Sequence, residues 1–252
     1  MTEQQALYNY CIHLGDNALI QSYRLSEWCS NAPILEEDLA LTNMALDMTG
    51  RAQLLLQYAG TLAGKGLTSD DLAYRRNEPE YRNDLITELP DADFAFAMVK
   101  QMFVSTFEYF LYSALKASTD SNIASIAAKS VKEAQYHMAH TTDWVVRLGD
   151  GTDESNRRAQ EAVDALWPYT AELFETDDTE AMLTAKGIAA ELPLIHTRWQ
   201  NYITGTMLAA RLELPANAYH HTGGRKGIHT EYLGHILTEM QYLQRAYPDA
   251  TW

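Results

Sequence analysis

The chain has 252 residues and a mass of 28.4 kDa, of which 46% are hydrophobic and 21% charged, as in soluble globular proteins. Its formal net charge of −15 argues against DNA, RNA or an anionic membrane as main partners, because these need a basic surface. No apolar stretch approaches the roughly 20 residues of a membrane span, and the N-terminus lacks a signal segment. We therefore expect a cytoplasmic protein.

Helical periodicity dominates the sequence, and no segment alternates as a strand does. In chain order, the pattern predicts helices near 5–30, 35–63, 91–116, 121–148, 153–175, 178–186, 193–213 and 228–246. Pro168 should kink the fifth of them. The polar segment 67–91 is expected to be a connection with short helical turns, and 214–227 a loop. Without a linker that would separate domains, we predict one all-α domain over 1–252, with a four-helix core and additional C-terminal helices.

The first two long helices, and the next two, are laid out like the halves of a two-iron four-helix bundle. In such bundles one helix of each half supplies Glu or Asp, and the other supplies Glu-x-x-His. In the first half Asp47 is followed by Gly50 at the position of the imidazole. In the second half Glu133 is followed by Tyr136 at the third step, and His137 comes one place late. This pattern indicates a metal site that has lost ligands, which favours a structural role over catalysis.

Antiparallel helices pair residues by reflection about their turn. This places Asp16 opposite Asp47, and Glu133 between the levels of Gln101 and Glu108. The vestigial metal-site positions are therefore Asp16, Asp47, Gly50, Gln101, Glu108, Glu133, Tyr136 and His137. Acidic groups inside a bundle are costly unless they are paired, protonated or metal-bound. A buried hydrogen-bonded network, a single ion on Glu133 and His137, and solvent-facing placement all remain open at this stage.

The C-terminal loop is a second candidate site. Arg225 and Lys226 lie between glycines, in a basic turn whose exposed backbone donors suit an anion or a partner carboxylate. A solvated turn is the alternative. Four histidines also suggest zinc, but no cysteine accompanies them and their spacing matches no usual zinc pattern: His220, His221, His229 and His235.

Several segments together carry a resemblance to a known family: residues 14–17, 24–29, 38–47, 132–137, 148–152, 222–234 and 239–245. In them the chain resembles the structural C subunits of bacterial phenylacetyl-CoA epoxidases. The resemblance implies a ferritin-like fold and a complex with a catalytic A subunit that holds a di-iron centre. A small B subunit and a reductase with FAD and an iron–sulfur cluster complete that system. With NADPH and O2 it epoxidises the aromatic ring of phenylacetyl-CoA.

We therefore expect a non-catalytic structural subunit that has no catalytic residue, binds no cofactor and shows no activity alone. The main alternative is an active ferritin-like oxygenase or oxidase with an unusual metal site, formed by Asp16, Asp47, Glu133 and His137. A ferritin-type metal store and a helical adaptor unrelated to oxygenases are the others. Bound metal would distinguish the active enzyme from the structural subunit.

Overall fold

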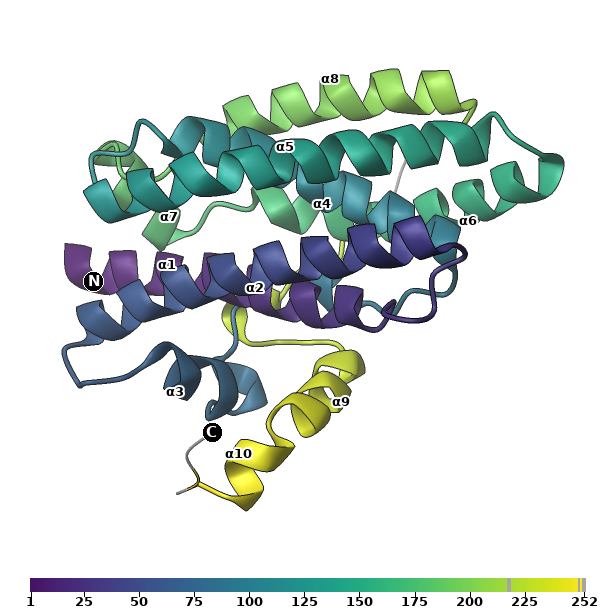
Figure 1. Cartoon of the computed structure of the whole chain (residues 1–252). Helices are drawn as coiled ribbons and strands as arrows, with labels where there is room; N and C mark the ends of the chain where they lie inside the picture. The colour runs from purple at the N-terminus through teal and green to yellow at the C-terminus, as the bar shows by residue number, and fades with distance from the viewer. Residues whose placement is uncertain (217–218, 249, 251–252) are drawn as a thin grey trace. The chain divides into compact units, whose positions relative to one another are not determined.

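The computed structural model describes residues 1–216, 219–248 and 250, and every regular element among them is helical (Figure 1). The predicted all-α class is confirmed. The chain divides into two compact units, residues 1–90 with 222–252, and residues 91–221. The single-domain organisation stays a prediction. None of the helices in the described part of the chain combines the length and apolar character needed to cross a membrane.

The first unit is built on a long helical hairpin (Figure 1). Its elements are α1 (Glu3–Ser26), α2 (Leu35–Ala63), α3 (Ser69–Tyr74), η1 (Glu78–Glu80), η2 (Leu85–Glu88), η4 (Gly224–Lys226), α9 (Glu231–Met240) and α10 (Tyr242–Ala246). The bounds of α2 are those predicted, and Gly64 ends it in the left-handed conformation, with φ 64°. A Cβ at Gly15 would lie 2.8 Å from the side chain of Leu56, so the two helices of the hairpin pack closely there.

The last helix differs from the prediction of one helix over 228–246. It begins only at Glu231 and is interrupted at Gln241, giving α9 and α10. The residues before Glu231 bond to another segment, because the amide of Thr230 donates to Glu88 at 2.8 Å. At the interruption, the side chain of Gln241 donates to the carbonyl oxygen of Arg76 at 2.9 Å. Contacts with residues far away in the sequence therefore decide where these helices begin and end.

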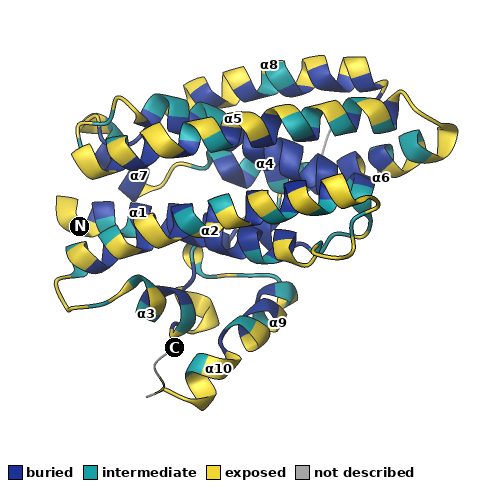
Figure 2. Cartoon of the chain, viewed as in Figure 1, coloured by how far each residue is buried: buried dark blue, intermediate teal, exposed yellow. Residues whose placement is uncertain are grey.

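The second unit packs several helices around one apolar helix. Its elements are α4 (Phe94–Leu115), α5 (Ser121–Gly149), α6 (Asp153–Thr170), η3 (Ala171–Phe174), α7 (Asp178–Ala185) and α8 (Leu192–Ala210). Most residues of α4 are buried, as expected of a helix that is apolar on all sides (Figure 2). The indole nitrogen of Trp199 on α8 donates to the carbonyl oxygen of Phe103 at 2.8 Å. The α-helix continues two residues past Pro168 and then tightens into η3.

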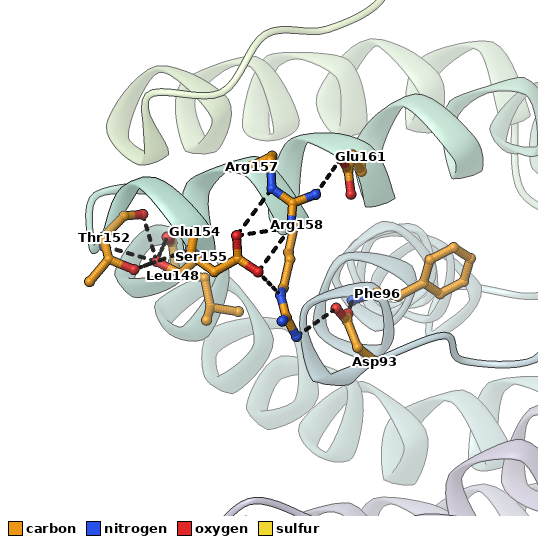
Figure 3. A network of polar contacts seen from close by, with 9 residues as sticks. All are labelled: Asp93, Phe96, Leu148, Thr152, Glu154, Ser155, Arg157, Arg158 and Glu161. Carbon is orange, nitrogen blue, oxygen red and sulfur yellow. Dashed lines mark hydrogen bonds and ion pairs between the residues drawn. The ribbon is translucent and has the colours of Figure 1, made fainter.

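A surface network ties the start of α6 to the start of α4 (Figure 3). Glu154 pairs with Arg157 at 2.9 Å and with Arg158 at 2.7 Å. Arg158 also lies 3.6 Å from Asp93, whose side chain caps α4. These side chains are solvent-exposed, so each pair contributes little to stability. The network is thus an exposed counterpart to ion pairs that are buried, such as Arg76 with Asp16 in the first unit.

Candidate functional site

Among the predicted vestigial positions, Asp16 has the best-defined hydrogen-bond partners. Its side chain is fully buried, and both of its carboxylate oxygens bond to the guanidinium of Arg76, one of them at 2.9 Å. The amide nitrogen of Arg82 donates to the same carboxylate at 2.9 Å. Burial opposes the charged form of Arg76, but the carboxylate of Asp16 outweighs this effect and raises the pKa of Arg76. The carboxylate is thus neutralised by the protein itself.

The placement of Asp16 opposite Asp47 stays a prediction, but the partners that the structure gives to Asp16 are Arg76 and Arg82. The segment after α2 folds back against α1 and brings Arg76 and Arg82 to the carboxylate. Asp47 and Gly50 on α2 are half-buried. Gly50 offers no side-chain donor at the position where an imidazole would be needed.

The other five positions lie in the second unit. Gln101 and Glu108 are buried on α4, and His137 is buried on α5. Glu133 is half-buried, with a carboxylate oxygen 3.8 Å from the ammonium of Lys129. Tyr136, at the third step after Glu133, is 51% exposed, which agrees with the solvent-facing placement that the sequence left open for these positions. One place along a helix is a rotation of about 100°, so burying His137 turns Tyr136 outward.

These residues do not fit a two-iron centre. Such a centre needs about four carboxylates and two imidazoles, and Asp16 is already occupied by Arg76. Among the residues that the structure describes, no three His, Cys, Asp or Glu side chains group as metal ligands. Cavities of about 520 and 500 Å³ occur in the first and the second unit, and none of the eight positions lines either of them.

The C-terminal segment 222–230, here called the clasp, forms a buried polar site that the sequence analysis missed. Its residue Arg225 pairs with Asp84 at 3.1 Å, and both side chains are buried. Nε2 of His13 lies 3.2 Å from both oxygens of Asp84, and the amide of Asn17 donates to one of them at 2.8 Å. Burial alone would raise the pKa of Asp84, but the charges of His13 and Arg225 outweigh it and lower the pKa to about 2.

A second carboxylate, Glu88, anchors the other end of the clasp. Nδ1 of His229 lies 2.6 Å from its carboxylate, and the hydroxyl of Thr230 donates to it at 2.6 Å. Glycine is required next to the first anchor, at the position just before Arg225. A Cβ at Gly224 would lie only 2.1 Å from the carbonyl oxygen of Asn83, closer than any real contact. The clasp therefore holds residues 83–88 by two buried carboxylates and a close backbone approach.

The clasp changes the interpretation of the C-terminal candidates. The guanidinium of Arg225 is directed inward to Asp84, so it is not an exposed anion contact, whereas Lys226 is exposed. His229 bonds to Glu88, and His221 stacks on Tyr169 with ring centroids 4.3 Å apart. Two features of the sequence could have indicated this site. One is a basic residue between glycines, Arg225, and the other is a pair of acidic residues, Asp84 and Glu88, in a segment that also carries Leu85, Ile86 and Leu89.

Comparison with known proteins now defines the class. A family model described as phenylacetic acid catabolic protein matches residues 1–252, so the chain belongs to this family of all-α, ferritin-like proteins. The chain is also 43% identical to the C subunit of the 1,2-phenylacetyl-CoA epoxidase of Escherichia coli strain K12. That similarity extends over 243 residues, which are 96% of this chain and 98% of the relative. The resemblance predicted from the sequence is thereby confirmed.

Proposed function

We propose that this chain is a non-catalytic structural subunit of a phenylacetyl-CoA epoxidase complex. The complex would use NADPH and O2 to epoxidise the aromatic ring of phenylacetyl-CoA, in the breakdown of phenylacetate. Membership is supported by the relative, which is named as the C subunit of such an enzyme and is matched over 98% of its length. A helical chain whose described residues form no group of three metal ligands suits a supporting role beside a catalytic subunit.

A single observation carries the non-catalytic assignment. Asp16 is the carboxylate that α1 would contribute to a metal site, and Arg76 and Arg82 hold it instead. A guanidinium in contact with both oxygens supplies the positive charge that an iron would otherwise supply. Gly50 without a donor and Tyr136 facing solvent agree with this interpretation.

The rest of the system would lie outside this chain. The proposed partners are a catalytic subunit with the di-iron centre, a small B subunit, and a reductase that carries FAD and an iron–sulfur cluster. The complex would assemble in the cytoplasm. This chain would act by offering a rigid helical surface that preorganises the helices of the catalytic subunit.

The test is to measure iron in the chain alone. The purified protein is incubated anaerobically with Fe(II), desalted, and analysed for bound iron by elemental analysis. The catalytic subunit, treated in parallel, is the positive control. We expect iron near background in this chain, and epoxidation only when the catalytic subunit is present.

Stoichiometric iron in this chain, or turnover by it alone, would overturn the proposal. The active-enzyme alternative would then gain support, with its site at Asp16, Asp47, Glu133 and His137. Glu133→Gln and His137→Ala would be the first variants to make. Loss of the bound iron in both would assign the site to α5.

A further inference from the structure

The outer face of α2 carries an apolar surface that the proposed function has not used. Leu35 is 70% exposed, Leu39 56% and Leu46 63%, and Figure 2 shows exposed positions along the length of α2. Leu54, further along the same helix, is 37% exposed. Isolated exposed leucines are ordinary, but several on one helix mark an interaction surface.

The spacing places three of these leucines on one line, whereas Leu54 projects about 100° from Leu35 and lies at the edge of the same surface. At 100° per residue, Leu35, Leu39 and Leu46 project within about 40° of one another. From Leu35 to Leu54 the helix rises about 28 Å, the length of a helix–helix contact in a bundle. The other exposed residues near this line are uncharged, namely Asn43, Thr49, Gln53 and Gln57. We call Leu35, Leu39, Leu46 and these neutral neighbours the α2 face, with Leu54 at its edge.

The charged residues of α2 indicate which kind of partner can bind to this face. Its five ionisable residues are Glu36, Glu37, Asp38, Asp47 and Arg51. Glu37 and Arg51, the single basic residue of the helix, are buried. The accessible charges that α2 itself places beside the face are therefore all negative, on Glu36, Asp38 and Asp47. A second copy of this chain would place its own acidic residues next to these, and the like charges would repel. A partner surface with basic residues beside an apolar stripe would be complementary to the α2 face in charge.

We propose that the α2 face is the docking surface for a partner subunit, and that the partner lays an amphipathic helix with lysine or arginine flanks along it. This inference rests on the proposed function, which supplies the partner: the catalytic subunit of the epoxidase. Burying the leucines provides affinity, and the acidic flanks provide orientation and faster association. The α2 helix also carries Asp47 and Gly50, so the helix that lacks the imidazole ligand would be the one that supports the partner.

Two single substitutions test the proposal, Leu39→Glu and Leu46→Glu. Both side chains are exposed, so the isolated chain should keep its helix content and melting temperature. The matched control is Leu208→Glu on α8, which makes the same change at a leucine that is 82% exposed. Binding of each variant to the purified catalytic subunit is measured by titration calorimetry or biosensor. We expect each α2 variant to bind at least ten-fold more weakly than wild type, and the control to bind as wild type does.

A second measurement uses only the wild-type chain, so its result does not depend on whether the variants fold. Hydrogen exchange of the wild-type chain is compared alone and in the complex, and α2 should be the helix whose exchange slows most. Protection elsewhere with α2 unchanged would overturn the inference. So would unchanged binding by both α2 variants, although the proposed function would stand.

The remaining outcomes separate the two proposals. If the wild-type chain does not bind the catalytic subunit at all, the proposed function fails, and the docking inference fails with it. If the wild-type chain is a dimer that Leu39→Glu dissociates, the α2 face is a homodimer contact and the charge argument is wrong. A wild-type monomer that binds the catalytic subunit through α2 supports both proposals.

Discussion

Replacing Arg76 by methionine should unfold the first unit at a markedly lower temperature. The variant keeps the apolar stem of the side chain but removes the guanidinium, which bonds to both oxygens of the fully buried Asp16. It also removes a bond to the carbonyl oxygen of Glu80 at 2.9 Å, and the contact of the guanidinium with the ring of Tyr81, 4.1 Å from its centroid. The carboxylate would remain buried without its main counter-charge.

The expected magnitude follows from these contacts. Breaking a buried ion pair by removing one partner costs about 3–5 kcal/mol. The amide of Arg82 still donates to Asp16 in the variant, so we take the lower end, about 3 kcal/mol. In a chain of this size about 1 kcal/mol lowers the melting temperature by about 2–4 °C, so the expected decrease is about 6–12 °C.

The assay is thermal and urea unfolding followed by circular dichroism, arranged as a double-mutant cycle with Asp16→Leu. Removing both charges leaves no buried ion without its counter-charge at this site, so the double variant should be more stable than Arg76→Met alone, with a coupling energy of about 2 kcal/mol or more. Arg157→Met is the control, because its guanidinium pairs with Glu154 and Glu161 in the solvent-exposed network (Figure 3). Its melting temperature should not change measurably. A loss below about 1 kcal/mol for Arg76→Met, or effects that simply add, would refute the reasoning.

Two further predictions concern the clasp. Folding lowers the pKa of Asp84 from 3.8 to about 2, so its carboxylate stabilises the fold above about pH 4 and loses that contribution, of the order of 2 kcal/mol, as the pH falls toward 2. Urea unfolding of wild type and Asp84→Asn between about pH 6 and 2 should show their stability difference narrowing below pH 4, and a constant difference would contradict the assignment. Gly224→Ala should cost about 1–3 kcal/mol, because its Cβ would lie 2.1 Å from the carbonyl oxygen of Asn83. In Gly205→Ala, where the new Cβ meets nothing within 4 Å on α8, stability should stay the same or rise, and equal losses in both variants would refute the packing argument.

Helix positions were predictable wherever local signals agreed. The bounds predicted for α2, residues 35–63, are those observed, because its apolar period runs without interruption up to a glycine that can adopt positive φ. The segment 67–91 was expected to be a polar connection with short turns, and it does contain α3, η1 and η2. What composition could not predict is that Asp84 and Glu88 within this segment are fully buried.

The missed burial has a simple physical cause. A carboxylate is buried only when it finds partners, and the partners of Asp84 are 71 residues earlier in the chain at His13 and 141 residues later at Arg225. Glu88 likewise depends on His229. From local composition, Asp84 and Glu88 would be assigned to the surface, because acidic residues are seldom buried without partners. A local sequence pattern carries no information about partners that lie so far away in the chain.

The sequence by itself determined the helical class, the family resemblance and the missing donor at Gly50, since each depends only on the order and identity of residues. Only the tertiary structure decided that Asp16 faces Arg76, that Arg225 points inward, and that Tyr136 lies outside. The physical reason is that the stability of a charge depends on which groups surround it after folding, and here those groups come from distant segments. The exposure of Leu39 and Leu46 is decided in the same way, by which faces of α2 its own unit leaves uncovered.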